Sequence, residues 1–185
     1  MPDPSLPRRF SSDVVVSGAA IFISLCTLVV LLYEARIMRE QQRAAVWPYV
    51  EIGPGFGDDG FHVIISNQGI GPARIQSMQV RVEDEPVRTW RAMFRVLGVA
   101  ESIDWQDKTN GRVIPAQSEI RSVRAAGGER AAEIARALLA EKRLAFELCY
   151  CSVYDECWRV ARQGRDETRE AVGSCGGDPA AEFQL

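Results

Sequence analysis

The chain has 185 residues, of which 46% are hydrophobic and 25% charged, a mixture typical of one globular domain with additional sequence. Its 22 basic and 25 acidic residues give a net charge of −3. Because the arginines are interspersed with acids and form no basic block, the sequence argues against nucleic-acid binding.

The N-terminal part contains one long uncharged segment. Residues 14–33, VVVSGAAIFISLCTLVVLLY, have no charged side chain, and a helix of this length spans about 30 Å, the thickness of the bilayer hydrocarbon. Arg8 and Arg9 precede the segment, as they would in a signal peptide. The apolar run is longer than the roughly 7 to 15 residues of a signal sequence, and no A-x-A cleavage pattern follows it. We therefore expect an uncleaved transmembrane helix.

The segments on either side of this helix differ in character. Residues 1–13 contain three prolines and are expected to form a disordered tail. Residues 34–47, EARIMREQQRAAVW, are good helix formers and predict that the helix continues as a juxtamembrane stalk. Pro48 removes a helix donor and favours an extended conformation at Trp47, so the stalk is expected to end there.

Beyond Pro48 the pattern changes to short strands. Strands are predicted over residues 49–52, 61–66 and 74–82, with a glycine-rich turn over 53–60. The segment 111–125 predicts a strand broken at Pro115. The glycines of 53–60 and of NQGIGPA, residues 67–73, complete neither a phosphate loop nor a dinucleotide-binding motif.

Two helices are predicted within this region. The first is amphipathic and would either pack on a sheet or face a partner, because its apolar residues recur at i, i+3, i+4 and i+7: Trp90, Met93, Phe94 and Leu97. The second covers residues 128–142, with Ala131, Ile134, Ala135 and Leu138 facing inward. Together these elements predict that residues 48–163 form an Ig-like antiparallel β-sandwich with two short helical insertions, followed by a loose tail, 164–185, tethered at Cys175.

The segment CYCSVYDECW, residues 149–158, carries three of the five cysteines. Alternation along the predicted strand 144–151 places its apolar side chains on the core face: Leu144, Phe146, Leu148 and Tyr150. Glu147, Cys149 and Cys151 then lie on the opposite face. Pairing Tyr150 with Trp158 and Leu148 with Val160 keeps the core face apolar in the following strand.

This register predicts the cysteine pairing. It places Cys151 opposite Cys157, close enough for a disulfide. A register looser by two residues would instead pair Val153 with Cys157. Cys149 and Cys151 are about 6.6 Å apart along one strand and are poor partners for each other, which leaves Cys149 to pair with Cys175.

Three alternatives to disulfides stay open. The thiols could be free, or the four cysteines could bind zinc, although CYC lacks the C-x(2 to 4)-C spacing of a structural zinc site. Redox chemistry of the thioredoxin type would need C-x-x-C at the start of a helix, which the sequence lacks.

The orientation of the helix depends on two opposing signals. Arg36, Arg39 and Arg43 follow the helix and Arg8 and Arg9 precede it, which slightly favours a cytoplasmic domain. Disulfides favour the opposite arrangement, because they persist in the periplasm and not in the cytosol. We expect a short cytoplasmic N-terminus and a periplasmic domain, with a cytoplasmic domain as the alternative.

The motifs QQRAAVWPYV, NQGIGPA and CYCSVYDECW together resemble a group of uncharacterised bacterial single-pass membrane proteins. The resemblance covers roughly residues 14–175 and implies an architecture but no activity. His62 is the sole histidine and is expected to be a strand residue, and the acids Asp58, Asp59, Asp155 and Glu156 lie in predicted turns.

We therefore expect a non-catalytic, membrane-anchored interaction module or accessory subunit of an envelope complex. It would bind no cofactor or metal, would contact the bilayer through residues 14–33, and would bind a membrane or periplasmic protein partner. The alternatives are a zinc or redox sensor that uses its cysteines, and an enzyme of unknown class.

Overall fold

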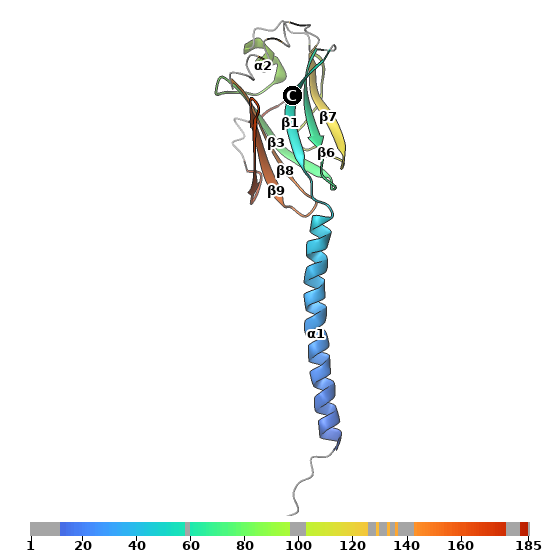
Figure 1. Ribbon diagram of the computed structural model, residues 1–185. Helices are drawn as coiled ribbons and strands as arrows, with labels where there is room; N and C mark the ends of the chain where they lie inside the picture. The colour runs from blue at the N-terminus through green and yellow to red at the C-terminus, as the bar shows by residue number, and fades with distance from the viewer. Residues whose placement is uncertain are drawn as a thin grey trace, which may run out of the picture. The chain divides into compact units, whose positions relative to one another are not determined.

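The computed structural model describes residues 12–57, 60–96, 103–125, 129, 133, 136, 143–176 and 182–184 (Figure 1). The chain divides into two compact units, Met1–Ala44 and Ala45–Leu185. The first contains one helix, and the second is mainly β and contains two antiparallel sheets.

The first unit contains α1, Ser12–Ala44, a helix of 33 residues with no buried side chain. Its most apolar window has a mean hydropathy of 2.6, so the helix is long and apolar enough to cross a membrane. A transmembrane anchor and a signal sequence share this property. The hydroxyls of Ser24 and Thr27 donate to the carbonyls of Ala20 and Ile23, at 2.8 and 2.9 Å, so both polar groups are bonded within the helix.

The helix continues past residue 33, as predicted, but it ends at Ala44 and not at Trp47. The Trp47 carbonyl instead accepts hydrogen bonds from the backbone of Ile70 and Gly71, at 3.0 and 3.3 Å. These bonds hold Trp47 against the loop that precedes β3.

The second unit has two antiparallel sheets. The first has the order β1 (Val50–Gly57), β2 (Gly60–Asn67), β7 (Ser118–Ala125), β5 (Ile103–Gln106). The second has the order β10 (Asp166–Val172), β9 (Cys157–Gln163), β8 (Leu144–Cys151), β3 (Ala73–Val82), β4 (Glu85–Val87), with β6 (Val113–Ile114) also paired to β3. Figure 1 shows the two sheets side by side.

One hydrophobic cluster unites the two sheets. Ile65 and Val123 from the first sheet and Met78, Leu148 and Tyr150 from the second belong to it, each fully buried. The alternation predicted for residues 144–151 is confirmed, because all four side chains assigned to the core face are at most 1% exposed. The register predicted for the hairpin is also confirmed, with Tyr150 opposite Trp158 and Leu148 opposite Val160.

Strand β3 departs from simple alternation. Its register with β8 shifts between Ile75 and Ser77, where Gln76 forms a bulge. The extra residue allows Ile75 and Met78 both to point into the core, although they are an odd number of positions apart.

The glycine-rich segment 53–60 is not a turn throughout, which corrects the sequence prediction. Gly53–Gly57 extends β1 and pairs with β2 up to Gly60. The ring of His62 lies directly over Gly55, where an added Cβ would meet the imidazole at 2.1 Å. Glycine therefore makes room for a neighbouring side chain here, in place of forming a loop.

The C-terminal segment also differs from the prediction of a loose tail. Asp166–Val172 forms β10 at the edge of the second sheet, and Phe183 is 5% exposed in the core. The strand forms because its backbone pairs with β9 from Asp166 to Val172, although its sequence has no apolar alternation. The second predicted helix lies largely outside the described residues. Glu129, Glu133 and Arg136 are helical and exposed there, as expected for its outer face.

The motif NQGIGPA is a structural junction between three loops. The fully buried Asn67 side chain accepts from the backbone of Tyr49 and Gly69 and donates to the carbonyls of Gly71, Ile114 and Pro115, at 2.8 to 3.2 Å. Gly71 lies so close to Val46 that an added Cβ would be 1.9 Å from its carbonyl oxygen. These residues therefore fix how the chain enters the β unit.

Candidate functional site

The structure contains both disulfides that the strand alternation predicts. Cys151 and Cys157 are directly opposite each other on β8 and β9 and are bridged, with a Cα separation of 4.0 Å. Cys149, two residues before Cys151 on the same face of β8, is bridged to Cys175, with a Cα separation of 5.6 Å. The fifth cysteine, Cys26, is free and lies on α1.

The two disulfides lie in contact with each other. The Sγ atoms of Cys151 and Cys175, which belong to different bridges, are 3.6 Å apart. Neither sulfur carries a proton, so this is a van der Waals contact between two bonded sulfurs and not a hydrogen bond. The sulfurs of Cys151, Cys157 and Cys175 all lie within 4.8 Å of one another.

The sulfur cluster lies at an open hollow of about 430 Å³ on the surface. Arg74, directly opposite Cys151 on β3, lines the hollow and forms an ion pair with Asp155. Cys175 is partly exposed, whereas Cys149, Cys151 and Cys157 are at most 7% exposed. A bridged sulfur has no thiolate with which to bind a metal, so zinc binding would require reduction of both bridges.

Helix α2, Trp90–Val96, does not present its apolar face to a partner. Trp90, Met93 and Phe94 are at most 2% exposed and belong to the core, and Phe94 contacts Phe61 edge to face at 5.6 Å between centroids. The alternative considered from the sequence, that the helix packs on the sheets, is therefore the correct one. Leu97, the fourth residue of the predicted stripe, lies outside the described residues.

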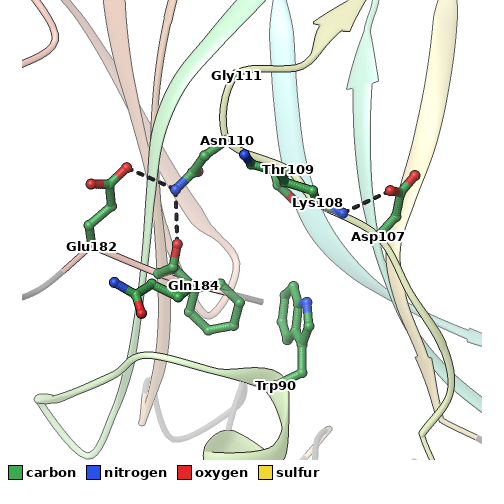
Figure 2. A pocket seen from close by; sticks show the side chains of 9 residues that line it. Trp90, Asp107, Lys108, Thr109, Asn110, Gly111, Glu182 and Gln184 are labelled. Atoms are coloured by element: carbon green, nitrogen blue, oxygen red, sulfur yellow. Dashed lines mark hydrogen bonds between the residues drawn. The ribbon is translucent and has the colours of Figure 1, made fainter.

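A cavity of about 540 Å³ lies beside Trp90 (Figure 2). The C-terminal segment 182–184 forms one wall, and Phe183 contacts the Trp90 indole with 4.5 Å between ring centroids. The backbone N–H of Phe183 donates to Met78, and the Asn110 side chain donates to Glu182 and to the Phe183 carbonyl, both at 2.9 Å. The chain therefore fills part of this cavity with its own terminus.

A charged cluster that the sequence analysis missed joins the edges of the two sheets. Arg169 of β10 donates to the Val50 carbonyl at 2.8 Å, and Arg162 of β9 donates to the Ile52 carbonyl at 3.3 Å. The Tyr150 hydroxyl accepts from the Val50 backbone at 3.4 Å. The presence of Arg162 and Arg169 in the sequence was the available signal for this cluster. It did not predict these contacts, because arginines on an edge strand usually face solvent.

Burial raises the pKa of two groups in this cluster. It raises the pKa of Tyr150 above 10.0, although the bond from Val50 and the charge of Arg169 act in the opposite direction. Burial also raises the pKa of Glu167 above 4.5, although Arg169 and Arg162 favour its carboxylate. Tyr150 is therefore neutral at neutral pH, and the carboxyl group of Glu167 contacts Arg169 at 3.1 Å.

Comparison with protein-family models, curated proteins and solved structures returns no match to this chain.

Of the candidate residues for enzymatic chemistry that the structure describes, His62 belongs to the first sheet, and Asp155 and Glu156 belong to the β8–β9 turn of the second. His62 is on β2, 7% exposed, and packs against Gly55 of the paired strand. Asp155 occupies the β8–β9 turn with a φ of 60°, a conformation that aspartate tolerates, and pairs with Arg74. Both are accounted for by packing and turn formation. Asp58 and Asp59 lie outside the described residues.

Proposed function

We propose that this protein is a membrane-anchored interaction module whose β domain binds another membrane or periplasmic protein. One observation carries the proposal: the large apolar side chains of residues 14–33, including Phe22, Ile23 and Leu28, are all more than half exposed in the isolated chain. Such a surface is stable only in contact with lipid or with other apolar helices. Residues 14–33 would therefore lie in the bilayer.

We further infer that residues 48–163 form an Ig-like sandwich. The first sheet, β1-β2-β7-β5, follows the A-B-E-D order of immunoglobulin domains, and β9-β8-β3-β4 follows G-F-C with an added C′ strand. Strand β10 extends the second sheet by one strand beyond this pattern. By analogy of fold alone, this architecture is compatible with a binding module.

Exposed apolar side chains at one end of the domain support protein binding. Trp47 and Ile70 are 44% and 62% exposed on two loops that hydrogen-bond to each other, and Val153 and Tyr154 are 46% and 44% exposed at the tip of the β8–β9 turn. The antiparallel pairing of Arg74 with Cys151 places the turn at the same end as the loop that precedes β3. A partner that covers this end would bury all four side chains.

The two disulfides support a periplasmic location for the domain, because such bonds are reduced in the cytosol. With the short N-terminal segment in the cytoplasm, the protein would span the inner membrane once. The resemblance of its motifs to bacterial single-pass membrane proteins agrees with this arrangement.

The anchor is tested by fractionation of cells that express either the full chain or residues 45–185. We expect the full chain to stay in the membrane pellet after alkaline carbonate extraction, and the shortened chain to be soluble. If cells that express the full chain yield a protein that has lost its N-terminal segment, α1 is a cleaved signal, and the anchor is overturned.

The binding surface is tested by photo-crosslinking in intact cells. A crosslinking amino acid replaces Ile70 or Tyr154, and Val96, which is 55% exposed on α2, serves as an apolar control. We expect the same discrete protein adduct from Ile70 and Tyr154 and none from Val96. Absence of a protein adduct from both positions, or identical adducts from all three, would contradict the proposal.

A further inference from the structure

We infer that the four cysteines of the β domain form a disulfide-exchange site. When an external thiol reduces the Cys149–Cys175 bridge, which we call the outer bridge, Cys175 can form a new bond to Cys151 in place of Cys149. This inference is independent of the binding partner proposed above. It rests on the arrangement of the sulfurs, and it assigns this part of the domain a chemical reactivity in addition to a structural role.

The sulfur positions carry the inference. The sulfur of Cys175 is bonded to that of Cys149 and lies 3.6 Å from that of Cys151. Cys149 and Cys151 project from the same face of β8, two residues apart, so Cys175 lies next to both. Since a disulfide bond is about 2 Å long, the sulfurs of Cys175 and Cys151 need to approach by roughly 1.5 Å to bond, and Cys175 must also move into line with the Cys151–Cys157 bond that it breaks. The strand pairing would not have to change.

The surroundings of Cys175 permit this displacement. Residues 173–176 follow the end of β10 and lie outside the strands, and a Cβ added at Gly173 or Gly176 would meet no neighbouring atom within 4 Å. Cys149, Cys151 and Cys157 are instead held on paired strands. Cys175 is thus the less constrained partner in the exchange, and β8 provides two fixed alternatives.

The hollow admits the co-reactant. The sulfurs of Cys151, Cys157 and Cys175 line an open space of about 430 Å³, and Cys175 is the most exposed of the four bridged cysteines. A small thiol, or the cysteine of a thiol-containing protein, can reach Cys175 from solvent. The bridges are inert toward each other until this occurs, because a fully oxidised cluster contains no thiolate to attack a disulfide.

The exchange has two steps. An external dithiol reduces the Cys149–Cys175 bond, so that two cysteine thiols form and the dithiol becomes a cyclic disulfide. The thiolate of Cys175 then attacks Sγ of Cys151: the Cys175–Cys151 bond forms, the Cys151–Cys157 bond breaks, and Cys157 leaves as a thiolate that takes a proton from water. The second step is redox-neutral, and the products are one bridge and the thiols of Cys149 and Cys157.

The exchange would keep the C-terminal segment attached to β8 while it releases the covalent link across the hairpin. Reduction of the outer bridge would thus lead to loss of the Cys151–Cys157 bond, which closes the β8–β9 turn that carries Val153 and Tyr154. An external thiol that reacts at the hollow would in this way remove the covalent constraint on the turn, while the Cys151–Cys175 bond keeps the C-terminal segment attached to β8.

The test uses the full chain with Cys149→Ser, which leaves Cys151, Cys157 and Cys175 in the β domain and the free Cys26 on α1. The protein is equilibrated in a reduced and oxidised glutathione buffer, free thiols are blocked with N-ethylmaleimide, and bridged peptides are identified by mass spectrometry after chymotryptic cleavage at Tyr150 and Tyr154. The reference is the same variant equilibrated in urea. In an unfolded chain, the Cys151–Cys175 bond closes a loop of 24 residues and the Cys151–Cys157 bond a loop of 6. The entropy of loop closure therefore makes the Cys151–Cys175 bond roughly eightfold less populated there.

We expect the folded variant to contain a larger share of Cys151–Cys175, with the maleimide on Cys157, than the urea reference. A share equal to or below that of the reference would show that the fold does not favour the exchange and would overturn the inference. Cys151→Ser is the matched control, in which Cys149–Cys175 should persist and Cys157 should carry the label.

A second measurement avoids any dependence on a variant. The unmodified chain is treated with substoichiometric dithiothreitol, blocked at short times and mapped in the same way. We expect singly bridged molecules to contain Cys151–Cys175 as well as Cys151–Cys157. Singly bridged molecules that retain an original bridge only, at every time, would contradict the exchange.

Discussion

The guanidinium of Arg169 lies over the ring of Tyr49, with 3.5 Å between its central carbon and the ring centroid. The same side chain donates to the Val50 carbonyl and pairs with Glu167. Because Arg169 is on β10 and Tyr49 directly precedes β1, this contact joins the first and last strands of the described residues.

Replacement of Arg169 by alanine should destabilise the domain. Its side chain is 16% exposed, so loss of the cation–π contact and of the bond to Val50 should lower the free energy of unfolding by about 2 kcal/mol. Arg169→Lys keeps the charge but not the planar contact and should give an intermediate value. Urea unfolding of the full chain in detergent, followed by near-ultraviolet circular dichroism, measures the difference, and an unchanged midpoint for Arg169→Ala would contradict this account.

Tyr150→Phe should change the stability of the domain at alkaline pH. The folded-state pKa of Tyr150 is raised above 10.0 by burial, so the unfolded chain releases the phenolic proton first. The stability linked to this group is therefore complete below pH 10 and declines as pH rises through the folded-state pKa. The phenylalanine variant should lose about 1 kcal/mol at pH 7 through the lost bond to Val50, and this deficit should shrink above pH 10. Tyr154→Phe, on an exposed turn, is the control and should show neither effect.

The two disulfides should contribute unequally to stability. On the chain-entropy model, a bridge that closes 26 residues stabilises by about 3.5 kcal/mol and one that closes 6 residues by about 2 kcal/mol. The double variant Cys149→Ser with Cys175→Ser should therefore unfold at a lower urea concentration than Cys151→Ser with Cys157→Ser. The reverse order would indicate that the hairpin bridge acts mainly on the folded state.

Removal of the Phe183 side chain should expose Trp90. Phe183 is 5% exposed and contacts the indole directly, so Phe183→Ala should destabilise by about 3 kcal/mol and shift the tryptophan emission to longer wavelength. Gln184→Ala, an exposed neighbour, should leave both the emission and the unfolding midpoint unchanged. Identical spectra for the two variants would mean that the C-terminal segment does not cover Trp90 in solution.

Gly71→Ala should disrupt the entry of the chain into the β unit. An added Cβ would meet the Val46 backbone at 1.9 to 2.5 Å, so the loop and residues 46–48 must separate. We expect a loss of roughly 2 kcal/mol or more, the range of overpacking substitutions. Gly173→Ala, which has no neighbouring atom within 4 Å, is the matched control and should be nearly neutral in the same unfolding assay.

The hairpin β8–β9 was predictable from sequence because several independent patterns coincide there. Apolar alternation from Leu144 to Tyr150 defines the core face, and the pairing of Tyr150 with Trp158 and of Leu148 with Val160 places Cys151 opposite Cys157. The same alternation leaves Cys149 on the outer face beside Cys151, which left Cys175 as its expected partner, and the structure contains this bridge.

Other elements lack such patterns. Strand β10, DETREAV, has no apolar alternation and is held by backbone pairing and by the contacts of Arg169, which depend on residues more than a hundred positions away. The bulge at Gln76 depends on how β3 meets β8, and the burial of Phe183 depends on a tertiary contact with Trp90. None of these relationships has a local signal.

The two bridges also determine the covalent topology of the last third of the chain. Cys149–Cys175 closes a large ring that contains β9 and β10, and Cys151–Cys157 closes a smaller ring nested within it. A protease that cuts the exposed turn at Val153 or Tyr154 would open the smaller ring without releasing a fragment. Such nicked molecules would migrate as intact chains on a non-reducing gel and separate into two fragments after reduction.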